Sequence, residues 1–450
     1  MTKLTLASHP YLLGFDQLER LVERSAKSGN EGYPPFNIEQ RSLVYRRAKD
    51  VMSVEPFGSH LSFDEPPYEW ITHSAAPVEA DPATFRIAVG GKDCTRPYSA
   101  SVFNISAMSF GSLGARAIEA LNRGAAMGGF YHDTGEGGVS RYHKAGGGDL
   151  VWEIGSGYFG CRASDGGFDE GKFAEQAALD QIKMIEIKLS QGAKPGHGGV
   201  LPGEKVTKEI AEARGIPVGQ RCESPPWHSA FSTPVELMEF VALLRERSGG
   251  KPVGFKLCVG KRHEVMAMMK AMIETGIRPD FMVVDGAEGG TGAAPAEFMD
   301  HVGAPLRDGL VFVRNALVGA GLKDEVRLAC AGKQISAFAL ASSMALGADW
   351  VNTARGFMFS LGCIQSLNCH NNHCPTGIAT QDAGLQRGLV VADKAVRVAN
   401  FHRNTLHSFA EIVGAAGRRH PGELSPDDLI RRIDDRHTAE GSVAFRLLER

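Results

Sequence analysis

Eight short stretches rich in apolar and β-branched residues recur from about residue 100 to residue 354. Several are nearly continuous apolar runs, as parallel strands covered on both faces require. Helical patterns such as "TPVELMEFVALLRER" and "HEVMAMMKAMIETG" separate them. The predicted strands span 102–106, 129–133, 184–189, 220–224, 253–258, 281–285, 326–331 and 350–354.

This alternation matches a (β/α)8 TIM barrel, which typically has about 250 residues. We therefore predict an α/β fold with three parts: a mostly helical or irregular N-terminal extension at 1–100, a TIM barrel at 101–420, and a C-terminal helical tail at 421–450. The first 25 residues predict the start of an amphipathic helix. An open doubly wound sheet is the alternative fold, but only a loose G-x-G-x-x-G-like feature supports it.

Glycine is concentrated in the loops that follow the predicted strands. The chain has 54 glycines in 450 residues, against an average of about 7%. Clusters such as "TGEGG", "QGAKPGHGG" and "GAEGGTGAAP" indicate backbone that approaches a ligand closely. Because TIM-barrel active sites lie after the strands, these loops are the predicted site.

The last two predicted strands end in "ACAGKQIS" and "NTARG". Loops at these positions of a TIM barrel frequently bind phosphate. Gly332, Lys333, Arg355 and Gly356 are therefore predicted to bind a cofactor phosphate. The alternative, that the two glycines only permit tight turns, is equally compatible with barrel geometry.

Three further cations are candidate site residues. Lys256 lies within the apolar stretch "GFKLC", where it is either an inward-facing functional cation or a sign that the strand register is wrong. Lys194 and Arg214 near the barrel mouth are able to clamp a dicarboxylate. For Arg214, a solvated position on a helix is the plainer interpretation.

Three cysteines, Cys363, Cys369 and Cys374, have the spacing C-x5-C-x4-C. A zinc site would need His370 or His373 as a fourth ligand, and the spacing differs from the C-x2–4-C pairs of zinc modules. Three thiolates suit an iron–sulfur cluster that lacks one iron corner. Inert thiols are the remaining alternative, but the density of cysteines favours a metal centre. The other histidines show no metal-binding spacing.

Composition excludes several classes of protein. The net charge of −3 gives no support for nucleic-acid binding, and no apolar run approaches the length of a membrane span. Eight cysteines in 450 residues are too few for a disulfide scaffold. The N-terminus lacks the order of a secretion signal, so we predict a cytoplasmic protein.

The motifs together resemble the FMN-binding synthase domain of glutamate synthases. They are "SAMSFGSL" (106–113), "TGEGG" (134–138), "QGAKPGxGG" (191–199), "LPGEKVT" (201–207), "SPP.H" (224–228), "GGTGAAP" (289–295) and "LGC.....C....CP.GIATQ" (361–381). The resemblance implies a TIM barrel that carries FMN. It also implies a 3Fe-4S cluster on Cys363, Cys369 and Cys374, which passes single electrons to the flavin.

The implied reaction is hydride transfer from reduced FMN to the imine of 2-oxoglutarate, which yields glutamate. The resemblance assigns Lys194 and Arg214 to the 2-oxoglutarate carboxylates and Glu136 to an active-site role linked to the control of electron flow. Implied flavin contacts are Met108, Ser109, Lys256, Gly290 and the Gly332 region.

The sequence departs from the family pattern in three ways. His197 stands where the family has a glutamate, and Val200 stands where it has a glutamine that contacts the keto acid. No counterpart of the N-terminal glutaminase domain or of the C-terminal β-helix is expected in this chain. Residues 1–100 match nothing in the family pattern.

We therefore expect an FMN and iron–sulfur oxidoreductase that acts on 2-oxoglutarate or a similar keto acid. Its electron donor would be ferredoxin or a partner reductase, and ammonia would come from solution or a separate glutaminase subunit. The alternatives are a flavin enzyme for a different keto acid or amine, and an electron-transfer subunit without amination activity. A flavin barrel of the IMP-dehydrogenase type gives no reason for the cysteine loop.

Overall fold

The computed structural model describes residues 35–51, 58–59 and 61–449. The helix predicted for the first 25 residues lies outside these ranges. Among the described helices, none has the length and apolar character needed to cross a bilayer. The predicted domain limits at residues 100 and 420 stay predictions.

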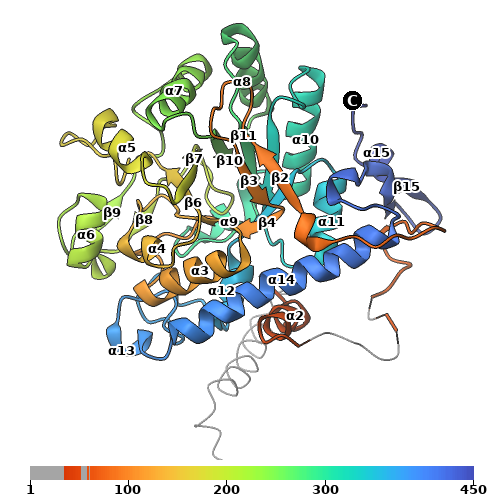
Figure 1. Cartoon of the computed structure of the whole chain (residues 1–450), viewed down its shortest axis with the longest axis horizontal. Helices are drawn as coiled ribbons and strands as arrows, with labels where there is room; N and C mark the ends of the chain where they lie inside the picture. The colour runs from red at the N-terminus through yellow and green to blue at the C-terminus, as the bar shows by residue number, and fades with distance from the viewer. Residues whose placement is uncertain (1–34, 52–57, 60, 450) are drawn as a thin grey trace, which may run out of the picture.

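The core of the molecule is a closed barrel of parallel strands, which confirms the predicted TIM-barrel class (Figure 1). The barrel closes where its last strand pairs with its first, in the register Val351 to Phe103 and Thr353 to Ile105. Its strands are β4 (Phe103–Ile105), β5 (His132–Asp133), β6 (Leu150–Ile154), β7 (Ile182–Lys188), β10 (Val253–Leu257), β11 (Phe281–Asp285), β12 (Arg327–Ala331) and β13 (Trp350–Thr353).

Two strand assignments differ from the prediction. The stretch 220–224 is not a barrel strand: β9 (Cys222–Glu223) pairs antiparallel with β8 (Val200–Leu201) in a hairpin within the β7–β10 connection. The missing barrel strand is β6, which lies between glycine clusters. Its Glu153 interrupts the apolar run, and its burial depends on Lys256 from β10.

Helices surround the barrel and join its strands. Local sequence fixes several of their starts: at α7, Thr233 Oγ1 accepts from Glu236 N at 3.2 Å, while Glu236 Oε2 accepts from Thr233 N at 3.1 Å. The helices that follow barrel strands are α3 (Ala115–Gly128), α4 (Arg141–Ala145), α5 (Glu170–Ala177), α6 (Lys208–Arg214), α7 (Pro234–Arg247), α8 (Arg262–Thr275), α9 (Ala296–His301), α10 (Leu306–Gly319), α11 (Ala337–Ala345) and α12 (Arg355–Leu361).

A long helix, α14 (Val391–Ala415), runs across the outside of the barrel in Figure 1. It packs against α3 and against α2 (Ile38–Ala48), so residues far apart in sequence form one helical layer. The crossing with α3 is close, because a Cβ at Gly124 would lie 2.4 Å from Val398 Cγ1. The short helix α13 (Ala383–Gln386) precedes α14.

A strand that precedes the family motifs in sequence pairs with a strand that follows them. β1 (Glu69–Ile71) pairs with β14 (Leu429–Arg432), which also pairs with β15 (Thr438–Glu440). The predicted helical tail is present as α15 (Gly441–Ala444) and the 3-10 turns Pro421–Glu423 and Pro426–Asp428, and it also contains these two strands.

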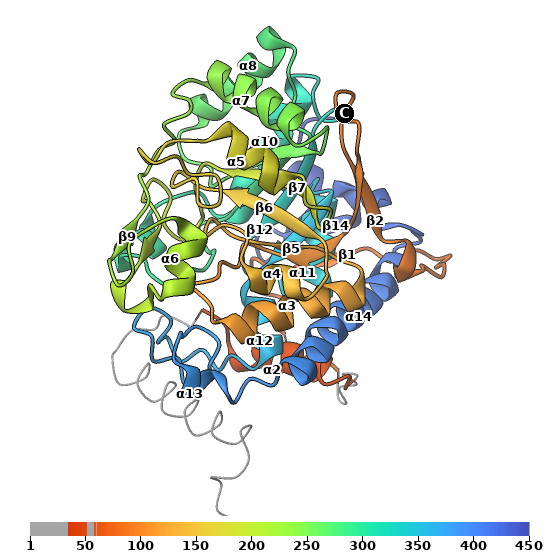
Figure 2. The ribbon, with the colours of Figure 1, turned by 60° about the vertical axis from the view of Figure 1, so that its left-hand side comes forward.

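A hairpin of β2 (Arg86–Val89) and β3 (Tyr98–Ser101) lies at the N-terminal end of the barrel. There, Gly91 N donates to Asp280 Oδ1 at 2.6 Å, just before β11. At the opposite end, α6 and β9 project away from the strands (Figure 2), beside the 3-10 turn Gly203–Lys205. The candidate site lies at that opposite, C-terminal end.

Candidate active site

A cavity opens at the C-terminal ends of the barrel strands. Its two adjoining parts share lining residues from several strand ends, and the larger part has a volume of about 400 Å³. The shared residues are Ala107, Glu153, Lys188, Gln191, Gly289, Gly290, Ala354 and Arg355. Loops after several different barrel strands therefore meet in one space, as TIM-barrel chemistry requires.

One wall of this cavity is basic. Of the four residues predicted for a phosphate site, Gly332, Lys333 and Arg355 line it, whereas Gly356 is not among the lining residues. Gly290, an implied flavin contact, lines it too. Burial lowers the pKa of Arg355 to about 10, and burial together with the Arg355 charge lowers the pKa of Lys333. An anion at this wall would relieve both costs, so the wall fits a phosphate group.

Gly290 keeps this basic wall open to a ligand. A Cβ at Gly290 would lie 2.6 Å from Arg355 Nε. Any side chain there would therefore displace the guanidinium or fill the space beside it. The close approach of the loop to Arg355 explains why glycine occupies this position.

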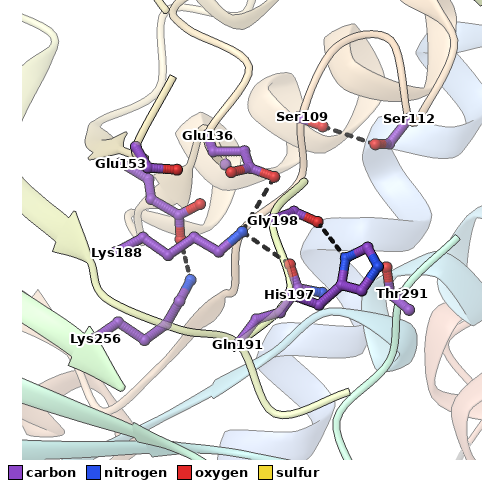
Figure 3. Close-up of polar contacts among 12 residues, drawn as sticks. Ser109, Ser112, Glu136, Glu153, Lys188, Gln191, His197, Gly198, Lys256 and Thr291 are labelled. Carbon is purple, nitrogen blue, oxygen red and sulfur yellow. Dashed lines mark hydrogen bonds and ion pairs between the residues drawn. The ribbon is translucent and has the colours of Figure 1, made fainter. Parts of the chain in front are cut away.

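A second wall carries an ion pair between two loops. Lys188 Nζ lies 3.1 Å from Glu136 Oε1 and donates to Gln191 Oε1 at 2.8 Å (Figure 3). Burial would raise the pKa of the Glu136 carboxyl, but the charge and hydrogen bond of Lys188 lower it below its usual value. Glu136 is therefore an ionised group at neutral pH.

Lys188 was missing from the predicted site residues. It is the last residue of β7 and lines both parts of the cavity. The available signal was a lysine at the C-terminal end of an apolar strand, directly before a glycine-rich loop.

The two predicted carboxylate-binding cations occupy different places. Lys194 is 3% exposed and lines the cavity, and its pKa is lowered to about 8, mainly by burial and then by the Lys188 charge. Arg214 is absent from the lining. Its guanidinium lies 5.0 Å from the centre of the Phe159 ring, and Nη2 donates to Phe110 O at 3.3 Å.

The two family departures also differ in position. Val200 lines the cavity. His197 is not a lining residue: its Nδ1 lies 2.9 Å from Gly198 O, and its ring meets Phe298 edge to face at 5.6 Å. Of these two residues, Val200 is therefore the one placed to contact a ligand in the cavity.

The predicted flavin loop after β4 lines the same cavity. Met108 and Ser109 are both lining residues. Met108 N donates to Asp133 O at 3.0 Å, and Met108 O lies 3.0 Å from His143 Nε2. Ser109 Oγ donates to Ser112 Oγ at 2.9 Å (Figure 3). These contacts hold the loop against β5 and α4.

Lys256 lies at the floor of the cavity and already has acidic partners. Its ammonium forms ion pairs with Glu153 and, at 3.2 Å, with Glu186. Burial alone would lower the pKa of Lys256, but these carboxylates raise it well above its usual value. Asp133 lies near the same two glutamates, and burial raises its pKa. Of the two alternatives predicted for Lys256, the structure shows the inward-facing one. Its immediate partners are carboxylates.

The cysteine loop joins the cavity directly. Cys363 and Cys369 line it, while Cys374 is buried with its Sγ 3.3 Å from Thr376 Oγ1. Lys205 Nζ contacts the loop by donating to Cys369 O at 2.7 Å. The cysteine loop therefore lies beside a buried cation.

The spacing of the three cysteine sulfurs bears on whether they hold a single zinc ion. In the described ranges, the one trio of metal-ligating groups within 4.8 Å of one another is Asp133, Glu153 and Glu186, so the cysteine sulfurs are more widely spaced. A single zinc ion with bonds of about 2.3 Å would hold thiolates about 3.8 Å apart. The three sulfurs therefore do not have the spacing that a single zinc ion would impose on them.

Comparison with known proteins agrees with the motifs. The conserved region of glutamate synthases matches residues 80–419. The glutamate synthase large subunit-like protein YerD of Bacillus subtilis is 41% identical over 349 residues, which are 77% of this chain and 66% of the relative.

Two further relatives carry glutamate synthase names. The archaeal-type glutamate synthase (NADPH) of Thermotoga neapolitana is 35% identical over 313 residues, 69% of this chain and 58% of the relative. The glutamate synthase (NADPH) large chain of Bacillus subtilis is 30% identical over 347 residues, 75% of this chain and 21% of the relative. The matches thus span less than two thirds of these relatives. Since the conserved region covers most of the chain, this protein belongs to the glutamate synthase family.

Proposed function

We propose that this protein is an FMN and iron–sulfur dependent oxidoreductase that reduces the imine of 2-oxoglutarate to glutamate. The observation that carries the proposal is the single cavity that brings together a basic wall, the Glu136–Lys188 pair and the cysteine loop. Family membership supports the reaction type. Because the matches cover less than two thirds of these relatives, the substrate and the partners are proposed for this chain.

The basic wall would hold the flavin phosphate. Arg355 and Lys333 would bind it, and Gly290 and Gly332 would leave the space that it needs. Gly356 would act indirectly, since a Cβ there would lie 3.0 Å from Thr353, a residue of the same wall. Bound FMN supplies hydride chemistry, and a 3Fe-4S cluster on Cys363, Cys369 and Cys374 supplies single electrons.

The remaining groups would bind and orient the substrate. Lys194 would hold a carboxylate of the keto acid, and Lys188 Nζ would present a proton to the cavity between Glu136 and Gln191. Met108 and Ser109 would cover the flavin. Arg214 would support Glu136 by its charge, which helps to keep the carboxyl ionised. Lys256 would act through Glu153, which also lines the cavity.

A second candidate substrate class follows from Val200. This residue lines the cavity where a glutamine would donate and accept hydrogen bonds, and valine does neither. Arg214, the second predicted carboxylate clamp, lies outside the lining. Both observations favour a keto acid that is less polar than 2-oxoglutarate as the alternative substrate.

The proposed activity is tested with protein purified without oxygen. Reduced ferredoxin or dithionite, ammonia and 2-oxoglutarate are expected to yield glutamate. Activity only with other members of a keto-acid and amine panel would instead support the second substrate class. A protein with both cofactors and no amination activity on the whole panel would contradict the proposal and favour an electron-transfer subunit.

Binding of 2-oxoglutarate is expected to weaken above about pH 8. The Lys194 ammonium has a pKa of about 8, so the free protein loses this cation as the pH rises through that value. The dissociation constant, measured by calorimetry without ammonia, is then expected to rise about tenfold per pH unit above the pKa. Lys194→Arg keeps its charge and should remove this dependence. The same pH dependence in that variant would contradict the assignment.

The Gly199→Ala substitution is expected to displace Glu136. A Cβ at Gly199 would lie 2.1 Å from Glu136 Oε1, so the carboxylate would have to leave Lys188. We expect kcat/KM to fall about a hundredfold, because a small displacement of a positioned group has effects of about this size. Gly260→Ala is the control, since its Cβ would meet no atom within 4 Å. Equal losses in both variants would contradict a specific effect on Glu136.

A further inference from the structure

A helical segment ahead of the family-matched region reaches the cavity. This segment comprises residues 35–49, whereas the conserved region begins at residue 80. Its helix α2 starts with a capping box, in which Asn37 Oδ1 accepts from Gln40 N at 2.8 Å. At its end, Asn404 Nδ2 of α14 donates to Arg47 O at 2.9 Å. The capping box thus defines the start of α2, and the contact with α14 anchors its end.

Phe36 forms part of the basic wall. Its side chain is 1% exposed and lines the cavity with Lys333 and Arg355. The Arg355 guanidinium carbon lies 4.8 Å from the centre of the Phe36 ring, within the range of a cation–π contact. The ring also meets Phe359 edge to face at 5.1 Å. Phe36 therefore restricts the position of the arginine proposed to hold phosphate.

The same segment is tied to the cysteine loop. Gln365 Oε1 accepts from Phe36 N, and Gln365 Nε2 donates to Phe36 O, each at 3.1 Å. Gln365 N in turn donates to Cys363 Sγ at 3.4 Å. Tyr45 OH donates to Cys363 O. Two points of the segment therefore hold one end of the cysteine loop.

Arg41 adds a buried charge at this junction. It is 2% exposed, and its Nη1 has no hydrogen-bond partner among the residues that the structure describes. Arg41 lies one helical turn before Tyr45 on α2, and Tyr45 OH donates to Cys363 O, so α2 carries this charge toward the cysteine loop. A buried guanidinium with an unused donor is costly unless it faces negative charge.

We propose that residues 35–49 act as a clasp over both cofactor sites, with Phe36 positioning Arg355 at the flavin phosphate and Arg41 supplying positive charge to the metal centre at Cys363. This proposal rests on the proposed function, because it assumes FMN and a cluster. It adds positioning residues from a segment outside the family-conserved region, and it couples the two cofactor sites through Gln365.

Arg41 is tested by the reduction potential of the cluster, measured by EPR-monitored titration of the anaerobically purified protein. Arg41→Gln is expected to lower the potential, because loss of a nearby positive charge disfavours the added electron. Arg41→Lys should restore it. Arg123→Gln removes an exposed charge on α3 that pairs with Glu119, and it should leave the potential unchanged.

Phe36 is tested by equilibrium binding of FMN to flavin-depleted protein. Phe36→Ala is expected to weaken binding about tenfold, as the loss of a desolvated cation–π contact and its packing would do. Phe36→Tyr keeps the ring and should bind as the wild type does. If Phe36→Ala fails to fold, Phe36→Leu keeps most of the volume without the ring face and should show the same loss.

Different results would contradict the proposed function and the clasp. A wild-type protein that takes up neither FMN nor iron would overturn the proposed function and this proposal together. A wild-type protein that carries both, with an unchanged potential in Arg41→Gln and unchanged FMN affinity in the Phe36 variants, would overturn the clasp alone.

Discussion

Replacing Cys369 by alanine is expected to abolish the iron centre while leaving FMN bound. Cys369 is one of three thiols in the loop, and with two ligands left a 3Fe-4S cluster loses an iron corner. Iron content and the EPR signal of the oxidised cluster should fall to background. The flavin absorbance should remain, because Arg355 and Lys333, which are proposed to bind the flavin phosphate, are not part of the cysteine loop.

The matched control is Cys94→Ala. Cys94 lies at the N-terminal end of the barrel, where its Sγ donates to Gly250 O at 3.2 Å. This variant should keep both iron and flavin. Full iron content in Cys369→Ala, or equal loss in the two variants, would show that the cysteine loop does not hold the centre.

Replacing Arg355 by glutamine is expected to weaken FMN binding by about a hundredfold. A charge-assisted contact to phosphate contributes about 3 kcal/mol, which corresponds to that factor. The arginine is oriented by Phe36 and by a hydrogen bond to Glu288 O, so its guanidinium is held in a defined position at the basic wall. Fluorescence of free and bound flavin gives the dissociation constant.

Riboflavin, which lacks the phosphate, separates this role from a general loss of structure. Its affinity should be nearly equal in the wild type and in Arg355→Gln. If FMN and riboflavin lose affinity equally, the arginine supports the pocket without contacting the phosphate. Lys333→Gln provides the companion variant, since Lys333 lies on the same wall.

The fold class was predictable because apolar strands and helical patterns alternate along the chain. The count of strands was right although one assignment was wrong and one strand was missed. β6 was missed because Glu153 breaks its apolar run, and that residue is buried only through an ion pair with Lys256 of β10. The pairing is non-local, so no window of sequence around β6 contains it.

The candidate site was predictable where a motif follows a strand end. Lys333, Arg355, Gly290, Glu136 and Lys194 all line the cavity. Positions that depend on packing between distant segments were not predictable. The segment 35–49 reaches the basic wall through contacts with α14, α12 and the cysteine loop, all of which are distant in sequence. Similarly, Arg214 points to Phe159 because β6 and α6 bring them together.

The closure of the barrel has a consequence for how the chain folds. β4 lies near residue 103, and its partner β13 lies near residue 351, so almost the whole barrel sequence separates two neighbouring strands. A chain emerging from the ribosome therefore exposes an unpaired β4 edge until β13 has been synthesised. Such distant pairing slows folding and leaves the open edge prone to aggregation. Closure therefore comes late in biosynthesis, and the cavity is complete only after it.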